Sequence, residues 1–469
     1  MTLSKKFTTS LITISLVASS IVGTAFASET PKSDSKIAVS GNTKNPRNII
    51  FMVGDGMGPS YNSAYRHFAD NPDTKEIEPT AFDQYLKGQQ KTDPNDPKEN
   101  VTDSAAGATA FSTGQKTYNG AISVDENKKK LKSVLEQAKE DGKSTGLVVT
   151  SEITDATPAA YASHVDDRDK KDEIAKQFYN EKINGEHTVD VLLGGGQKYF
   201  GSQNGNLQKK FKKDGYDVVH NKNALKNAKS DKILGLFADE NMPLQIDAPN
   251  KNPKLVDMQK SALQRLEKNK KGFFLMVEGS SIDKSGHPND ITGVMSEMSG
   301  FEDAFKNATS YAKSHPDTLV VATADHSTGG LTIGKGKDYV WNPDAIKSMK
   351  HSGSYMTEQI AKGKDPKKVI NEGYGFKVDE NQINIISKEA DKLSKLKEED
   401  SQYETQLQAL QDAIQKPIND KSHTGWTTKG HTGEDVNMYA MGAGSNKFDG
   451  LIDNTDNAKF IFSFLENKS

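Results

Sequence analysis

A serine lies beside a carboxylate in the segment Thr102–Ala110, which reads TDSAAGATA. The residues that follow Ser104 are small, so a bulky anion can approach its hydroxyl group. Asp103 can lie near a helix N-terminus, where backbone N–H groups also favour an anion. Runs of Ala, Gly and Ser form close-packed helices without any chemical role as well. The segment therefore indicates a nucleophile on a helix only if further groups for anion chemistry occur elsewhere in the chain.

Carboxylates and imidazoles occur together at later places in the chain. Asp283 and His287 are four residues apart, so both can face one ion from a helix or a tightly turned loop. Asp325 and His326 directly follow an apolar run, and His431 precedes a strand-like tail. The chain has ten histidines and no cysteine, so a metal would have only oxygen and nitrogen ligands. This chemistry suits hydrolytic zinc or magnesium rather than an iron–sulfur cluster or a Cys₄ zinc site.

A second set of candidate ligands contains oxygen atoms only. Asp155, Thr157 and Glu278, together with Asp55, would suit Mg²⁺, which takes few protein ligands and keeps several waters. Arg168 follows Thr157 by eleven residues. Its guanidinium group can bind two phosphate oxygens at once, although the surrounding aspartates also allow a plain surface charge there.

The elements that must position these residues are short apolar runs that end at turn residues or candidate ligands. They are Asn48–Val53, Gly146–Thr150, Val189–Leu193, Phe273–Val277 and Thr318–Ala322. Helical patterns alternate with them, over Leu131–Glu140, Leu255–Asn269 and Val294–Lys313. This alternation predicts an α/β fold, a three-layer α/β/α sandwich around a large, mostly parallel central sheet. Ligands bind such sheets beyond the carboxyl ends of the strands, where the candidate residues fall.

Residues 340–425 have a different character, because they are highly charged and their apolar residues are spaced as in helices. We interpret them as a helical insertion that precedes the last histidine motif and packs on the body of the protein through amphipathic helices. The alternative is that this insertion shapes the entrance of the site or a subunit interface.

The chain has 469 residues, 27% of them charged, and a formal net charge of −3, which argues against a protein that coats nucleic acid.

Residues 1–27 have two lysines, an uncharged stretch and the sequence Ala25-Phe26-Ala27, so we expect a signal peptide that is cleaved after Ala27. The alternative is an uncleaved membrane anchor. Residues 28–46 are expected to be a flexible leader, and no later segment is apolar enough to span a membrane.

These motifs, taken in order, resemble the alkaline phosphatase family in its bacterial branch. The matching segments are Gly54–Gly58, Asp103–Ala110, Asp155–Ala160, Arg168, Glu278–Lys284 with His287, Asp325-His326 and His431–Gly433. The resemblance extends from residue 49 to about residue 442. It implies a catalytic domain over residues 47–469 and an exported homodimer, found outside the cell, at its surface or in the periplasm. The implied activity is hydrolysis of a broad range of phosphate monoesters through a phosphoserine, with two Zn²⁺ and one Mg²⁺ per chain.

The resemblance also implies a role for each residue. Ser104 resembles the nucleophile, Arg168 the phosphate clamp and Lys284 a water-mediated phosphate contact. The implied metal ligands are Asp283, His287 and His431 for the first zinc, Asp55, Asp325, His326 and Ser104 for the second, and Asp55, Thr157 and Glu278 for magnesium. Asp155 resembles an acid that holds magnesium-bound water.

Three other functions compete with this interpretation. A sulfatase would need Pro and Arg shortly after the nucleophile, and Ser104 is followed by Ala-Ala-Gly. A phosphodiesterase of the same superfamily needs no clamp on two free phosphate oxygens, so Arg168 favours monoesters. A non-catalytic, exported phosphate- or metal-binding protein would not need Ser104. A second His-Thr-Gly begins at His423, which remains an alternative to His431 as the third zinc-binding imidazole.

Overall fold

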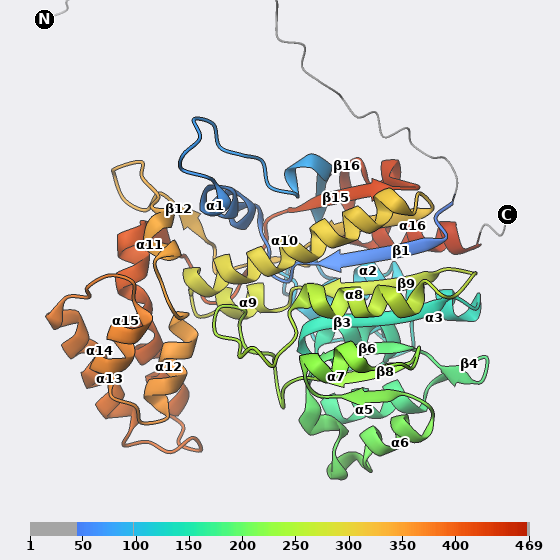
Figure 1. Cartoon of the computed structure of the whole chain (residues 1–469), viewed down its shortest axis with the longest axis horizontal. Coiled ribbons are helices and arrows are strands. Elements are labelled where there is room, and N and C mark those ends of the chain that lie inside the picture. The colour runs from blue at the N-terminus through green and yellow to red at the C-terminus, as the bar shows by residue number, and fades with distance from the viewer. Residues whose placement is uncertain (1–44, 97, 467–469) are drawn as a thin grey trace, which may run out of the picture. The chain divides into compact units, whose positions relative to one another are not determined.

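The computed structural model describes residues 45–96 and 98–466, and a ten-stranded sheet runs through them (Figure 1). The expected signal peptide and leader lie almost wholly outside the described residues. Across the sheet the strands are β16 (Gly450–Asp453), β2 (Leu86–Lys91), β15 (Val436–Gly442), β10 (Thr318–Thr323), β1 (Asn48–Val53), β9 (Phe273–Glu278), β3 (Ser144–Glu152), β6 (Val191–Gly195), β8 (Ile233–Leu236) and β7 (Asp217–Val219). Only β15 runs against its neighbours among these strands. The expected large, mostly parallel sheet is confirmed.

Helices cover both faces of this sheet, and the central strand β1 shows why. Ile50 and Met52 contribute to one hydrophobic cluster, whereas Ile49, Phe51 and Val53 contribute to the other. Successive side chains of a strand point to opposite faces, so a strand buried on both sides is apolar throughout. The first cluster includes residues of α1 (Pro59–Ala69), α7 (Lys222–Asn227), α8 (Leu255–Leu266) and α10 (Ile291–Ser314). The second includes residues of α2 (Ser104–Thr113), α3 (Val134–Glu140), α4 (Ala156–Ala162), α5 (Lys171–Asn180), α6 (Leu207–Lys213) and α16 (Asn454–Glu466). The three-layer sandwich is therefore confirmed.

Some element boundaries differ from those expected from the sequence. The helix expected from Leu131 begins at Val134, because Ser133 caps it and accepts a hydrogen bond from the backbone of Glu136. The helix expected from Val294 begins at Ile291, after the cap residue Asp290. Capping side chains determine where both helices begin, and the spacing of apolar residues does not reveal these caps.

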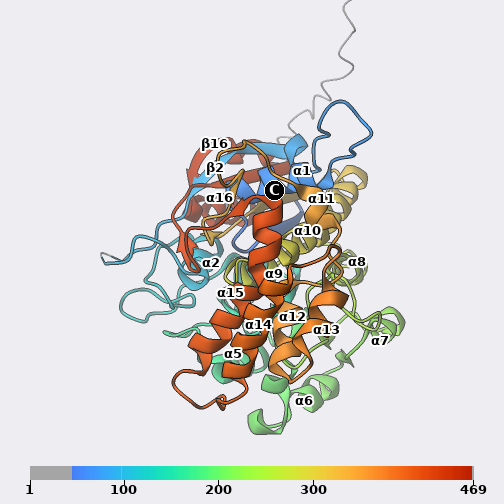
Figure 2. The ribbon, with the colours of Figure 1, turned by 90° about the vertical axis from the view of Figure 1, so that its left-hand side faces the viewer.

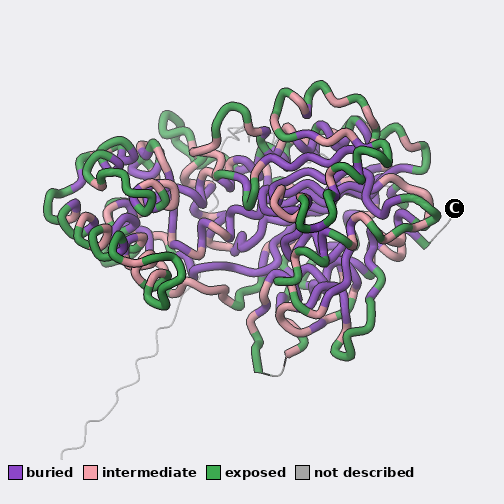
Figure 3. Tube along the Cα trace, turned by 90° about the horizontal axis from the view of Figure 1, so that it is seen from below, coloured by how far each residue is buried: buried purple, intermediate pink, exposed green. Residues whose placement is uncertain are grey.

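The segment 340–425 contains five helices, as expected (Figure 2). They are α11 (Pro343–Lys347), α12 (Gly353–Ala361), α13 (Pro366–Gly373), α14 (Glu380–Leu393) and α15 (Tyr403–Ser422). Ile386, Leu410 and Ile414 are buried and extend the first hydrophobic cluster. Buried and exposed positions alternate along these helices, whereas the central strands are buried throughout (Figure 3). The insertion is thus attached to the body by amphipathic helices.

Short strand pairs bring distant segments together near one end of the sheet. β11 (Ser327–Thr328) pairs with β14 (His431–Thr432), and β12 (Thr332–Ile333) pairs with β13 (Thr424–Gly425). The segment that follows α15 therefore pairs with the segment that follows β10. A separate hairpin consists of β4 (Lys182–Ile183) and β5 (Glu186–His187). The short helix α9 (Ser281–Gly286) follows β9. None of the helices that the structure describes is both long and apolar enough to cross a bilayer.

Candidate active site

The candidate residues gather at the carboxyl ends of four neighbouring strands. Val53, the last residue of β1, pairs with Glu278 of β9 on one side and with Thr323 of β10 on the other. Glu278 in turn pairs with Val149 of β3. Residues a few positions beyond these pairs therefore share one edge of the sheet, the edge at which open α/β sheets bind ligands.

Ser104 is the first residue of α2 and is buried, with 4% of its surface exposed. Asp103 caps this helix by accepting a hydrogen bond from Ala106 N at 2.9 Å. The Ser104 hydroxyl lies 3.0 Å from Nε2 of His326. Gly107, one turn later, eases the close approach, since a Cβ there would lie 3.3 Å from the Cβ of Asp325. The small residues of this helix thus allow it to lie against the loop that carries the other candidate ligands.

A first ligand group consists of Asp283, His287 and His431, whose ligand atoms lie within 4.8 Å of one another. Asp283 Oδ2 is 3.3 Å from His287 Nε2, and the Nε2 atoms of the two histidines are 3.2 Å apart. Each Nδ1 is engaged by a backbone carbonyl, that of Lys429 at 2.5 Å from His287 and that of Thr102 at 2.9 Å from His431. Protonation at Nδ1 would leave the Nε2 atom of each ring free to bind a metal, as in metal sites.

A second ligand group consists of Asp55, Asp283 and His326. Asp325 approaches the same imidazole, with Oδ2 at 3.1 Å from Nε2 of His326. Asp55 Oδ1 and Asp325 Oδ2 are buried and have no hydrogen-bond partner among the described residues. Unsatisfied buried carboxylate oxygens are costly, so this donor set fits a cation that would complete it.

The pKa values of these groups reflect burial next to like charges. Burial, reinforced by Asp325 and Asp283, raises the pKa of Asp55 well above its usual range. Burial and the neighbouring His326 lower the pKa of His431 to about 4. His431 is therefore neutral near pH 7 and able to act as a ligand, and a bound cation would relieve the repulsion among the carboxylates.

Glu278 belongs to neither carboxylate and imidazole group in the part of the chain that the structure describes. Glu278 and Thr157 are both almost completely buried, Thr157 in the first turn of α4 and Glu278 at the end of β9. Burial raises the pKa of Glu278 to about 8, although Ser280 Oγ donates to its Oε2 at 2.6 Å. The charge of Glu278 also contributes to raising the pKa of Asp55.

Arg168 and Lys284 form the cationic side of the site. Arg168 Nη1 lies 3.0 Å from Asp103 Oδ2, and its Nη2 lies 3.3 Å from Asp155 Oδ1. Lys284 Nζ donates to Asp155 Oδ2 at 2.8 Å. Burial opposes ionisation of Asp155, but Lys284 and Arg168 outweigh it and hold the pKa of Asp155 well below its usual range. Asp155 thus contacts both cations, and Arg168 also contacts Asp103, the residue that precedes Ser104.

The structure separates the two histidine motifs. His431 lies in β14, opposite Thr328 of β11, and this pairing brings it to the first ligand group. His423 ends α15 with a φ of 55°, is near the surface, and has Nδ1 3.4 Å from the carbonyl of Lys335. It belongs to neither ligand group among the described residues.

Sequence reasoning missed the residues that support the ligands. Thr328 Oγ1 donates to Asp283 Oδ1 at 2.5 Å, and the Tyr61 hydroxyl donates to the carbonyl of Thr328 at 2.7 Å. Lys171 pairs with Glu152 and lies 4.0 Å from Asp155 Oδ1. Thr328 follows His326 by two residues, which is the one signal that pointed to it; Tyr61 and Lys171 have no signal in the sequence.

The chain as a whole matches a known family. The model of the alkaline phosphatase family matches residues 46–467, so the chain belongs to this family and is a phosphoric monoester hydrolase. Alkaline phosphatase 3 of Bacillus subtilis (strain 168) is 47% identical over 462 residues, which cover 98% of each chain. The repressible alkaline phosphatase of Saccharomyces cerevisiae is 36% identical, over 92% of this chain and 83% of that one.

Solved structures show the same fold. The cold-active alkaline phosphatase of Shewanella sp. is 40% identical, with a TM-score of 0.79 over 90% of this chain and 100% of that one. The Thermus thermophilus alkaline phosphatase is 26% identical, with a TM-score of 0.78 over 94% of this chain and 96% of that one.

Proposed function

We propose that this chain is an exported, metal-dependent phosphomonoesterase that works through a phosphoserine at Ser104. The observation that carries the proposal is the position of the Ser104 hydroxyl. It lies 3.0 Å from His326, a member of one ligand group, while the neighbouring Asp103 holds Arg168. A nucleophile, cation ligands and a phosphate-binding guanidinium group thus meet in one place.

The residues present fit two zinc ions and one magnesium ion. Asp283, His287 and His431 would hold the first zinc, and Asp55, Asp325, His326 and Ser104 the second. Asp55, Thr157 and Glu278 would hold magnesium, and by the family resemblance Asp155 would hold water bound to it. When bound, the ions would lower the pKa of the serine hydroxyl and stabilise the charge on the attacking and departing oxygens.

The chain's own groups bind and orient the phosphate. Arg168 is fixed by Asp103 and Asp155, so its two outer nitrogens face a fixed direction and can donate to two phosphate oxygens together. Lys284 adds a second positive charge on the same side. The Ser104 oxygen loses its proton to solvent and forms the new bond to phosphorus. The bond between phosphorus and the ester oxygen breaks, and that oxygen takes a proton from water and leaves as the alcohol. Water then replaces the serine oxygen, which releases inorganic phosphate and restores the hydroxyl group.

Monoesters are favoured over diesters because the cationic side contains two groups. A phosphate monoester presents oxygens with nearly two negative charges near neutral pH, and a diester presents one. We further propose a broad range of monoester substrates, a homodimer and a location outside the cytoplasm. These three statements rest on the family resemblance and on the residues before position 45.

The experiment that tests the function is an assay of the metal-loaded protein on a phosphate monoester, next to Ser104→Ala. We expect turnover to fall by several orders of magnitude, without reaching zero because water can still attack the bound ester. Ser112→Ala removes a buried hydroxyl from the same helix and should retain activity, since that hydroxyl donates only to the carbonyl of Thr109. A metal-loaded Ser104→Ala protein with the full rate would exclude the nucleophile. A metal-loaded wild-type protein without turnover would favour a non-catalytic binding protein.

A further inference from the structure

A loop over residues 118–123 lies between α2, the helix that begins with the candidate nucleophile, and the segment that leads to the candidate phosphate-binding arginine. On one side, Thr109 Oγ1 of α2 donates to the carbonyl of Ala121 at 3.0 Å. On the other side, Ile122 pairs with Val165 in an antiparallel bridge. The loop is therefore placed to set the distance between the nucleophile and the arginine.

Asn119 of this loop is hydrogen-bonded to the segment that enters α2. Its Oδ1 accepts from Asp103 N at 2.9 Å. Its Nδ2 donates to the carbonyl of Val101 at 3.1 Å and to Oε2 of Glu99 at 2.8 Å. These three contacts use the amide oxygen and both amide N–H groups. Asn119 thus fixes the backbone just before the nucleophile.

Gly120, the next residue, connects Asp103 with Arg168. Gly120 N donates to Oδ2 of Asp103 at 3.0 Å, and its carbonyl accepts from Arg168 N at 2.8 Å. The guanidinium group of Arg168 donates from Nη1 to the same Oδ2 at 3.0 Å. Arg168 is therefore held at both ends, its backbone by the loop itself and its guanidinium group through Asp103.

The carboxylate of Asp103 follows its backbone, which Asn119 holds. Each carboxylate oxygen has its own contacts, because Oδ1 accepts from Ala106 N at the start of α2 and Oδ2 accepts from the loop and the arginine. A shift of the Asp103 backbone would therefore move the guanidinium group relative to the nucleophile. A misplacement of about 1 Å can cost about a hundredfold in rate, even when it arises away from the reacting atoms.

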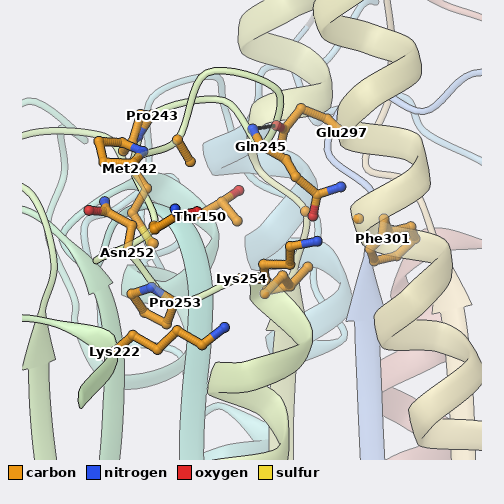
Figure 4. A pocket seen from close by; sticks show the side chains of 16 residues that line it. Thr150, Lys222, Met242, Pro243, Gln245, Asn252, Pro253, Lys254, Glu297 and Phe301 are labelled. Carbon is orange, nitrogen blue, oxygen red and sulfur yellow. Dashed lines mark hydrogen bonds between the residues drawn. The ribbon is translucent and has the colours of Figure 1, made fainter. Parts of the chain in front are cut away.

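The polar groups around a small cavity beside Gly279 have no such connection (Figure 4). The cavity measures about 100 Å³, and its carboxylate, Glu297, accepts a hydrogen bond from Gln245 N at 2.6 Å. Among the described residues, no hydrogen bond joins its lining to Ser104 or Arg168. These side chains are therefore not candidates for the same role.

We propose that Asn119 is a positioning residue of the phosphate site, whose amide holds the backbone of Asp103 so that Asp103 can hold the guanidinium group of Arg168 next to the nucleophile. The inference deepens the phosphomonoesterase function proposed above and rests on it. Asn119 acts through Asp103 and Arg168 and takes no part in making or breaking bonds.

The test compares metal-loaded Asn119→Ala with the metal-loaded wild type on 4-nitrophenyl phosphate. Its kcat/KM should fall about tenfold, because the arginine remains but is less well oriented toward the phosphate. Inhibition by inorganic phosphate should weaken by a similar factor. Zinc content should not change, since Asn119 has no hydrogen bond to a candidate metal ligand among the described residues.

A double-mutant cycle separates positioning from a merely structural role. In an Arg168→Ala background, Asn119→Ala should lower kcat/KM by less than about twofold, because the group that it positions is no longer present. A side chain that only stabilises the fold would lower kcat/KM by the same factor in both backgrounds.

Asn269→Ala is the matched control. Asn269 lies between α8 and β9, at the amino ends of the strands, and its Oδ1 accepts from Lys271 N at 3.0 Å. Its Nδ2 donates to the carbonyl of Gly142 at 2.9 Å and to Oγ of Ser144 at 3.1 Å. It thus contacts one backbone N–H, one carbonyl and one side-chain oxygen, as Asn119 does. Its loss should leave kcat/KM and phosphate inhibition unchanged, because these contacts lie at the edge of the sheet opposite the site.

Gly120→Ala replaces Asn119→Ala if that protein does not fold. Gly120 has a φ of 88°, and beyond its chain neighbours no atom lies within 4 Å of the position of a Cβ, so alanine strains the same loop without a clash. It should weaken phosphate inhibition in the same way. Unchanged activity, or the same loss with and without Arg168, would overturn the positioning role while the monoesterase function stands. If the metal-loaded wild type does not hydrolyse the ester, the proposed function fails and this inference with it.

Discussion

Arg168 is the residue at which the difference between ester classes should be visible. Two carboxylates hold its guanidinium group in place, so the arginine can bind two phosphate oxygens without being reoriented. Arg168→Ala should therefore keep its metals, weaken inhibition by inorganic phosphate and lower monoester turnover more than diester turnover. Arg168→Lys should recover only part of the loss, because an ammonium group makes no paired contact.

The measurement is the ratio of monoester to diester kcat/KM, with zinc content determined in parallel. Lys182→Ala, which removes a cation on the distant β4 strand, is the control. Equal damage to both ester classes in Arg168→Ala would contradict the clamp role and leave the preference for monoesters to the family resemblance.

The two histidine motifs give a second prediction at the residue scale. His431→Ala should lose one zinc per chain and most of the turnover, because its Nε2 lies 3.2 Å from that of His287. His423→Ala should lose neither, since His423 contacts only the carbonyl of Lys335 among the described residues. Metal analysis of both purified variants decides between them, and zinc loss in His423→Ala alone would reverse the assignment.

At the scale of elements, helix α10 contains a buried carboxylate that should make stability depend on pH. Burial raises the pKa of Glu297 from its ordinary value of 4.5 to about 7. The pKa of Glu297 is thus higher in the folded than in the unfolded state. Its contribution to the free energy of unfolding is complete below about pH 4.5 and is lost as the pH rises from there through about 7. Glu297→Gln keeps an oxygen for the backbone of Gln245 and removes this loss.

We therefore expect Glu297→Gln to gain on the wild type as the pH rises, by up to about 3 kcal/mol at the alkaline end. The measurement is the difference in Tm between variant and wild type at about pH 5 and about pH 8.5. Glu372→Gln, an exposed residue of α13 that pairs only loosely with Lys368, should show no such change. A constant difference in Tm between the two pH values would show that Glu297 is ionised in the folded protein at both.

At the scale of the whole molecule, the ligand groups join segments from most of the chain. Asp55 and Asp325 come from two different loops and Asp283 from helix α9, and the three lie together in the interior, where their charges repel. Chelation should therefore abolish activity and also lower Tm by about 5 °C or more, because bound cations stabilise the folded state alone.

Zinc with magnesium should restore both activity and Tm after chelation. The same chelator saturated with zinc beforehand is the control, since it exposes the protein to the same compound without removing metal. Full activity and an unchanged Tm in protein shown by elemental analysis to be free of metal would overturn the metal-dependent function.

The sequence by itself determined the class of fold and the candidate chemistry. Buried parallel strands must be apolar on both faces, so runs such as Asn48–Val53 and Phe273–Val277 are visible without a structure. Their order along the chain, with acidic residues and histidines just beyond them, predicted a site at one edge of the sheet. The absence of cysteine limited a metal to oxygen and nitrogen ligands.

Only the tertiary structure decided which of these residues meet. The motifs at His423 and His431 read alike in the sequence, but the pairing of β14 with β11 depends on backbone hydrogen bonds between segments about a hundred residues apart. The support of Asp283 by Thr328, and the hydrogen bond from Arg168 N to the carbonyl of Gly120, likewise arise from contacts between distant parts of the chain. Local composition cannot encode such contacts, because they form only when the sheet brings its loops to a common edge and the insertion packs beside them.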